Sequence, residues 1–455
     1  MKTLLIPHTS RLAIAIVALA SFAASAQEFH VLRHFTGTAN DGAQPLGSLA
    51  VSGSALFGMT KFGGVYSNGI LFRMDTSGAG FTVLRSFDTA TNDGQNPYGT
   101  PLVIGNDIYG MVTTEISGRT GTIFRIGTDG ANWQVLRRFS GTDGKWPYGD
   151  LVESGGMLYG LNTYGGSSTG SGWVGNGTLF QISTNGSNYL LLHKFTGGSS
   201  DGANPHGSPL VSNSVIYGMT GNGGNSGMGT IFRINTDTNG YQIIHHFAGG
   251  TADGQGPGGG LLLSGSTLYG MTRQGGVSNN GTIFRIDTNG ANFQVLHSFT
   301  GATNDGVGPV GGTLVQSGAT LYGMTYQGGT AGTGAIFSLN TNGGSFQVLH
   351  NFNGTDGGNP LGSLTLSGST LYGMTYGGGS NNLGAIFALD LPRPALAISK
   401  SGTNIDLSWD TNCTDFTLEN TDRLGGTWTS VPGVTGYSAT LPIVATTNQF
   451  FRLRN

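Results

Sequence analysis

The chain has 455 residues, of which 83 are glycine and only 9% are charged, and its net charge is −3. With its few basic residues scattered, this composition argues against a nucleic-acid-binding protein, a binder of acidic membranes and a disordered chain. A lone cysteine, Cys413, excludes an internal disulfide.

The first 26 residues have the pattern of a signal peptide. Lys2 and Arg11 precede the apolar run 12–20, and Ala24-Ser25-Ala26 offers a small-residue cleavage site before Gln27. We therefore expect export, to a secreted, extracellular or cell-surface location. No later apolar run reaches the roughly 18 residues that a membrane span needs, so no span is expected in the mature chain.

Residues 27–390 are predicted to form one repeat region. The clearest copy contains Val-Leu-His-Ser-Phe, Asp-Gly, Leu-Tyr-Gly-Met and Gly-Ala-Ile-Phe in that order. A period near 50 residues made of short β-type runs predicts a kelch-like propeller. In the fifth copy the four predicted strands cover 260–264, 267–272, 282–287 and 293–299. The Asp-Gly pair recurs 50 to 58 residues apart, at Asp41, Asp93, Asp143, Asp201, Asp253, Asp305 and Asp356.

The two ends of the repeat region are complementary. It begins with a strand of the fourth type, 29–35, and ends after a strand of the third type, 384–389. Pairing these two would close a ring and hide the strand edges that an open sheet exposes. The predicted fold is therefore all-β: a seven-bladed β-propeller with four-stranded blades, closed by the N-terminal strand.

A different pattern follows a two-proline linker at 391–394. Residues 395–455 contain about six short alternating runs, which predict a small β-sandwich of fibronectin-like or immunoglobulin-like type. Trp409 and Trp428 are expected in its core, because a domain this small needs large side chains inside.

The repeated motifs, together with Gly-Thr-Ile-Phe-Arg and the Gly-Gly loop, resemble the Gloeo-Verruco (GloVer) repeat family of exported bacterial proteins. The resemblance covers about residues 29–390. It implies a propeller-like fold and an exported bacterial protein, and it implies no established activity.

A candidate ligand site lies in the third blade. Loops from the fourth to the first strand and from the second to the third strand share one face of a propeller. In this blade those loops carry the predicted ligand-binding residues Trp146, Tyr148, Tyr164 and Trp173, aromatic residues that suit the apolar faces of sugars. The alternative is structural, with Trp146 filling a gap between blades and Trp173 covering its own loop.

The repeated polar residues are interpreted as scaffold. The carboxylates of the seven Asp-Gly pairs are expected to accept bonds from nearby backbone amides, because they lie too far apart to share one calcium ion. His193, His245, His297 and His350 occupy one position in successive blades and are expected to point outward, protecting the outer strands. No catalytic residue, metal ligand or cofactor is assigned.

The leading functional hypothesis is a secreted, non-catalytic binding or adhesion protein that recognises an extracellular glycan or protein through the loop face. One alternative is a polysaccharide-acting hydrolase or lyase with a site assembled across blades. An inward-facing carboxylate pair or a histidine with a perturbed pKa would favour that alternative. The other alternative is a purely structural component of the cell envelope.

Overall fold

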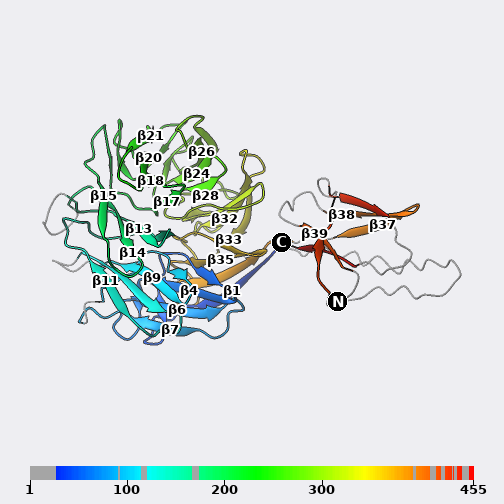
Figure 1. Ribbon diagram of the computed structural model, residues 1–455, viewed down its shortest axis with the longest axis horizontal. Coiled ribbons are helices and arrows are strands. Elements are labelled where there is room, and N and C mark those ends of the chain that lie inside the picture. The colour runs from blue at the N-terminus through cyan, green and yellow to red at the C-terminus, as the bar shows by residue number, and fades with distance from the viewer. Residues whose placement is uncertain are drawn as a thin grey trace.

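The computed structural model describes residues 27–90, 93–113, 120–166, 174–392, 396–409, 417–421, 426–432, 434, 438–442 and 450–454. All regular structure in these residues is β, and the strands gather into many small sheets (Figure 1). The described residues include no helix long and apolar enough to pass through a bilayer.

Within 28–390 the described residues form seven four-stranded antiparallel sheets, a propeller-like arrangement. Strand order follows chain order in six of them. The first two are β3 (Ala50–Ser52), β4 (Ala55–Thr60), β6 (Ile70–Asp75), β7 (Thr82–Ser86), and β8 (Leu102–Ile104), β9 (Asp107–Val112), β10 (Thr122–Gly127), β11 (Gln134–Arg138). The next two are β12 (Val152–Ser154), β13 (Met157–Asn162), β14 (Thr178–Ser183), β15 (Leu190–Lys194), and β17 (Leu210–Ser212), β18 (Val215–Thr220), β20 (Thr230–Asn235), β21 (Gln242–His246). Then follow β23 (Leu262–Ser264), β24 (Thr267–Thr272), β26 (Thr282–Asp287), β27 (Gln294–Ser298), and β29 (Val315–Ser317), β30 (Thr320–Thr325), β32 (Ala335–Asn340), β33 (Gln347–Asn351).

The seventh sheet joins the two ends of the repeat region. It contains β34 (Thr365–Ser367), β35 (Thr370–Thr375), β36 (Ala385–Asp390) and, at its edge, β1 (Glu28–His34). The predicted pairing of the first and last strands is present: β1 runs antiparallel to β36, from Glu28 opposite Asp390 to His34 opposite Ala385. Figure 1 shows the blue β1 beside the brown strands that end the repeat region.

The Leu-Tyr-Gly-Met motif forms the second strand of a sheet, where successive side chains face opposite sides. In β24, Leu268 belongs to a core cluster on one side, and Tyr269 and Met271 belong to the cluster on the other side. Gly270 leaves room for the Phe284 ring of the next strand, since a Cβ on this glycine would lie 2.5 Å from Phe284 Cζ. The motif is therefore a packing requirement of the sheet.

Seven hydrophobic clusters link the sheets in a closed circuit. Six of them contain buried residues from two sheets that follow one another along the chain. The remaining one brings Leu56 and Phe72 of the first sheet together with Tyr372 and Ile386 of the last. Burial of apolar surface between sheets thus stabilises the circuit without any disulfide.

Seven glycines, one from each sheet's entering loop, meet at the centre of the circuit. A Cβ on Gly207 would lie 1.9 Å from the carbonyl oxygen of Gly259, so only glycine allows this backbone approach. Each of the others makes the same close approach to the next, and the last approaches the first. They form the central glycine ring: Gly47, Gly99, Gly149, Gly207, Gly259, Gly312 and Gly362.

A belt of hydrogen bonds runs beside the central glycine ring. The backbone amide after each ring glycine donates to the side chain of the equivalent residue in the next sheet, for example Thr100 N to Asp150 Oδ1 at 2.6 Å. Desolvation raises the pKa of Asp150, although the hydrogen bonds from Thr100 and Ser208 act in the opposite direction. The belt is interrupted at Gly260, which has no side chain to accept a hydrogen bond from the backbone amide of Ser208. The belt residues are Ser48, Thr100, Asp150, Ser208, Thr313 and Ser363.

The C-terminal segment contains two three-stranded antiparallel sheets. They share a small core that includes Leu407, Leu418 and Trp409, which confirms the core position expected of Trp409; Trp428 is half-buried. The predicted linker, 391–394, lies partly outside the described residues. The strands are β37 (Ala397–Ser401), β38 (Asn404–Ser408), β41 (Ser438–Pro442), and β40 (Thr429–Ser430), β39 (Thr417–Thr421), β42 (Phe450–Arg454).

Replacing a glycine of the central ring is expected to destabilise the fold. The Gly207→Ala methyl group would meet the Gly259 carbonyl, and we expect the free energy of unfolding to fall by about 2 kcal/mol or more. The matched control is Gly377→Ala, whose Cβ would meet nothing closer than 3.7 Å. Urea unfolding monitored by tryptophan fluorescence measures both; equal stability of the two variants would contradict the close packing described here.

Candidate ligand-binding site at the loop face

The Asp-Gly loops and the Gly-Gly loops lie together. In four sheets they pair directly as two-residue antiparallel ribbons, which confirms that both loop types share one face. The ribbons are β2 (Gly42–Ala43) with β5 (Phe62–Gly63), β16 (Gly202–Ala203) with β19 (Asn222–Gly223), β22 (Gly254–Gln255) with β25 (Gln274–Gly275), and β28 (Gly306–Val307) with β31 (Gln327–Gly328).

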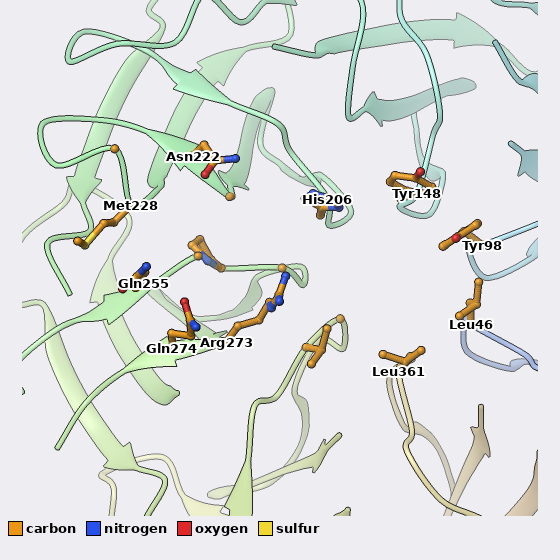
Figure 2. Close-up of a pocket in the computed structure, with 17 residues that line it drawn as sticks. Leu46, Tyr98, Tyr148, His206, Asn222, Met228, Gln255, Arg273, Gln274 and Leu361 are labelled. Atoms are coloured by element: carbon orange, nitrogen blue, oxygen red, sulfur yellow. The ribbon is translucent and has the colours of Figure 1, made fainter. Parts of the chain in front are cut away.

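The residue before each glycine of the central ring lies at the inner edge of this face. Five of the seven positions carry a large side chain, while Gly258 and Gly311 carry none. A cavity of about 490 Å³ occupies the space that remains, and Figure 2 shows the labelled side chains surrounding it. The inner positions are Leu46, Tyr98, Tyr148, His206, Gly258, Gly311 and Leu361.

Three aromatic rings from successive loops form an arc along one wall. The Tyr98 and Tyr148 rings have centroids 4.4 Å apart at an interplanar angle of 51°. Tyr148 and His206 are parallel within 1° and their centroids are 5.7 Å apart. All three are half-buried, so part of each ring surface is open to the cavity. We call these three residues the aromatic arc.

The opposite wall is polar and cationic. Arg273 and Gln274, both exposed, line the cavity together with Gln255. A second cavity of about 660 Å³ adjoins the first, because both are lined by Leu46, Tyr98, Arg273, Gln274, Val310 and Leu361. The second cavity adds Lys61, Tyr326 and Tyr376. We call the two cavities together the loop-face basin.

Lys61 and Arg273 influence the arc electrostatically. The Lys61 ammonium donates to the Tyr98 hydroxyl at 3.3 Å. Burial, and to a smaller extent the positive charge of Arg273, lower the pKa of His206 to about 4. His206 is therefore a neutral aromatic ring at neutral pH.

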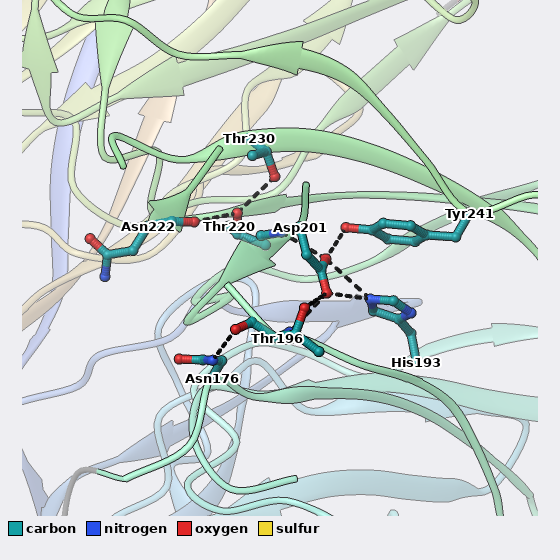
Figure 3. A network of polar contacts seen from close by, with 9 residues as sticks. Asn176, His193, Thr196, Asp201, Thr220, Asn222, Thr230 and Tyr241 are labelled. Carbon is teal, nitrogen blue, oxygen red and sulfur yellow. Dashed lines mark hydrogen bonds and ion pairs between the residues drawn. The ribbon is translucent and has the colours of Figure 1, made fainter. Parts of the chain in front are cut away.

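The aspartate of an Asp-Gly pair holds the loop that carries it, and Figure 3 shows this for Asp201. Asp201 accepts hydrogen bonds from the backbone amides of Thr196, at 2.8 Å, and Gly202, at 2.7 Å, and from the Tyr241 hydroxyl. His193 Nε2 lies 3.1 Å from its carboxylate. Burial opposes ionisation of Asp201, but the bonds from His193, Tyr241 and Thr196 outweigh it and lower the pKa to about 2.

Each sheet has an equivalent arrangement, which we call the clasp: an Asp, the Arg or His of the fourth strand, and an aromatic ring of the next sheet. The His193 ring stacks on Tyr241 with centroids 3.9 Å apart, and Phe29 of β1 completes the circuit by stacking on His350 at 3.6 Å. The paired residues are Arg33–Asp41, Arg85–Asp93, Arg137–Asp143, His193–Asp201, His245–Asp253, His297–Asp305 and His350–Asp356.

The clasp corrects one expectation and confirms another. His193, His245, His297 and His350 do not protect outer strands; their side chains are only 17–19% exposed, because each is enclosed between an aspartate and an aromatic ring. The expected bonds from backbone amides to the Asp-Gly carboxylates are present. Within the described residues, no three His, Cys, Asp or Glu side chains come close enough to hold a metal ion.

The four predicted ligand-binding residues are not all brought together. Tyr148 lines the basin. Trp146 is only 7% exposed and meets the Tyr164 ring edge-on at 5.4 Å, so its ring offers little surface to a ligand. Tyr164 is half-buried, and Trp173 lies outside the described residues. A binding role for these four stays a prediction.

Sequence reasoning missed Tyr98, His206 and Arg273. For Tyr98 and His206 the available signal was the difference between repeats at one position; Arg273 lies at another position, directly after the Met-Thr of the second strand. The residue before the central glycine varies from leucine to tyrosine, histidine and glycine, while the glycine itself recurs. A position that varies inside an otherwise regular repeat is free of packing demands.

The family assignment agrees with this architecture. A model of the Gloeobacter/Verrucomicrobia repeat matches residues 18–174 and 167–387. The chain belongs to this repeat family. No curated protein matches it.

Solved structures similar to this repeat protein share little sequence with it. An oligogalacturonate lyase in complex with manganese has 11% identity and a TM-score of 0.49, covering 81% of this chain and 97% of its own. A putative 6-phosphogluconolactonase from Bacteroides fragilis has 16% identity and a TM-score of 0.47, with coverages of 89% and 99%. TolB from Acinetobacter baumannii has 11% identity and a TM-score of 0.36, with coverages of 76% and 78%.

His206 is expected to make stability depend on pH. An unfolded chain binds a proton at His206 near pH 6.5, whereas the folded chain binds it only near pH 4. The unfolded state therefore holds more protons between these values, and stability falls as pH decreases from about 6.5 to about 4. In the His206→Gln variant we expect the free energy of unfolding to fall by about 1 to 3 kcal/mol less over this pH range than in the wild type.

Urea unfolding at pH 7 and pH 4.5, with an NMR titration of the His206 ring, measures this effect. In the titration, Arg273→Gln should raise the pKa of His206, since it removes a nearby positive charge. A wild-type pKa near 6.5 would contradict the desolvation of this ring by its surroundings.

Proposed function

We propose that the chain is an exported, non-catalytic binding protein that recognises an extracellular glycan through the loop-face basin. In this proposal residues 1–26 are a signal peptide and 27–390 form a seven-bladed β-propeller. Residues 391–394 are a linker, and 395–455 form a small β-sandwich that serves adhesion or display. The closed pairing of β1 with β36 and the seven four-stranded sheets support the propeller.

The aromatic arc carries the binding proposal. Pyranose rings have apolar C–H faces that stack on aromatic side chains, and their hydroxyl groups pair with amide groups placed nearby. Tyr98, Tyr148 and His206 supply ring surfaces, and Gln255 and Gln274 supply amides across the cavity. A volume of about 490 Å³ is within the ordinary range for small-ligand sites.

A glycan suits the basin better than a protein partner does. The arc lies in a concavity bounded by loops from several sheets, and a folded protein surface would have to project a segment into it. The basin is also preformed, because the clasps and the central glycine ring fix the loops. A rigid site loses little conformational entropy when a ligand binds.

Binding is favoured over catalysis by the composition of the lining. The described residues that line the two cavities include no aspartate or glutamate, whereas glycoside hydrolysis commonly uses a pair of carboxylates. One observation favours the enzyme alternative: the pKa of His206 is strongly lowered, as is common at functional sites. Loss of polymer length on incubation with the protein would indicate an enzyme.

The arc can be tested directly. The wild-type chain is screened on an array of neutral and acidic oligosaccharides, and the best binder is measured by calorimetry. We expect Tyr148→Ala and Tyr98→Ala each to weaken binding about tenfold, the loss of roughly 1.4 kcal/mol of stacking. Tyr66→Ala is the matched control, because Tyr66 is 53% exposed and does not line the basin. Unchanged affinity of both arc variants would refute this site.

The predicted contribution of the third-repeat loop is tested separately. If Trp173 also touches the ligand, Trp173→Ala should weaken binding by several-fold with no change in the unfolding midpoint. If binding is unaffected, the site is confined to the loop-face basin and the prediction for Trp173 is wrong.

A further inference from the structure

Four arginines of the repeat region are neutralised by a carboxylate. Arg33, Arg85 and Arg137 pair with the clasp aspartates, and Arg125 pairs with Asp107 at 2.7 Å. Among the residues that the structure describes, the two cations that line the loop-face basin, Lys61 and Arg273, are not neutralised in this way. In the described part of the chain, neither Lys61 nor Arg273 lies within ion-pair distance of a carboxylate.

These two cations face a basin with no opposing charge. The described residues that line both cavities include no aspartate or glutamate. The whole chain has a net charge of −3, so the positive basin is not a consequence of a basic protein. Arg273 also lies close enough to His206 for its positive charge to lower the pKa of that ring, in the same direction as the main cause, desolvation.

Resting on the proposed glycan-binding function, we propose that the basin selects acidic sugars, whose carboxylate or sulfate groups pair with Arg273 and Lys61. The Arg273 guanidinium can donate two parallel hydrogen bonds to a planar carboxylate or to a sulfate. Lys61 supplies a point charge beside Tyr98. An oligosaccharide stacked on the aromatic arc and extending into the second cavity would bring acidic groups to the cations that line it.

The position of the two cations in the repeat supports the proposed selection of acidic sugars. Lys61 and Arg273 occupy the same position of the repeat, directly after the Met-Thr of the second strand. Tyr326 and Tyr376 occupy the equivalent position in two other repeats and also line the basin. In successive repeats around the circuit this position therefore carries Arg273, Tyr326, Tyr376 and Lys61, so that two tyrosine rings lie between the two cations. An oligosaccharide stacked on such rings could present acidic groups to the cations at either end.

The test compares matched oligosaccharides with the whole chain by calorimetry. The probes are a uronic acid hexamer, the same hexamer after reduction of its carboxyl groups, and the reduced hexamer after sulfation. We expect the uronic acid or the sulfated hexamer to bind at least tenfold more tightly than the neutral one, and the preferred probe identifies the anionic group. Raising the salt concentration should weaken only the acidic probes.

Charge-removing variants identify the residues. Arg273→Gln and Lys61→Gln should each reduce the preference for the acidic probe several-fold while leaving the neutral hexamer unaffected. Arg138→Gln and Lys194→Gln are the controls, because they remove the same charges from exposed positions outside the basin.

The outcomes separate the two proposals. If neutral and acidic hexamers bind equally well and both depend on Tyr148, the glycan-binding function stands and the selection of acidic sugars is overturned. If the control variants lower the preference as much as Arg273→Gln does, the selection reflects overall charge and the assignment to the basin is overturned. If none of the hexamers binds at any salt concentration, both proposals fail.

Discussion

The clasp is the interaction on which the rest of the structure depends. An Arg or His of the fourth strand pairs with the aspartate of the following Asp-Gly turn and stacks on an aromatic ring of the next sheet. One side chain therefore links a sheet, its outgoing loop and its neighbour. Because the loop continues from Asp201 to His206 and Gly207 in six residues, the clasp also fixes the inner edge of the loop face. The clasps therefore determine both how neighbouring sheets are linked and where the residues of the candidate site lie.

A regular scaffold acquires an irregular site because a constrained position and an unconstrained position lie side by side in each repeat. Glycines of the central ring allow backbones to approach so closely that no other residue fits, and the Leu-Tyr-Gly-Met strands interlock in the same way in each sheet. The residue directly before each ring glycine is not constrained by this close backbone packing. It differs from sheet to sheet, and the differences create the opening at Gly258 and Gly311 and the aromatic arc opposite. Variation at this position changes the lining of the basin, whereas the ring glycine itself is the same in each sheet.

Local sequence predicted the strands well and the site poorly, for physical reasons. Period-two apolar runs and glycine turns located β24 and β26 to the residue, because strand faces must alternate wherever both are buried. The site depends on which side chains meet across loops 50 or more residues apart, and no local pattern encodes that. Trp146 is predicted to bind a ligand because tryptophan occurs at this position in one repeat only. In the structure its backbone is left-handed, with φ of 51°, and its ring is packed among the loops. Lys61 and Arg273 were overlooked because isolated cations are common on surfaces.

Hydrogen exchange of the segment 196–208 tests the central role of the clasp most directly. In the free wild-type chain, mass spectrometry should find its amides protected, because the loop is held by Asp201 and His193. In His193→Ala the account predicts faster exchange in this segment, with β18 and β20 unchanged, since their core contacts do not involve His193. Exchange in 196–208 that is equally slow in the variant, or already unprotected in the wild type, would contradict the claim that the clasp builds the loop face.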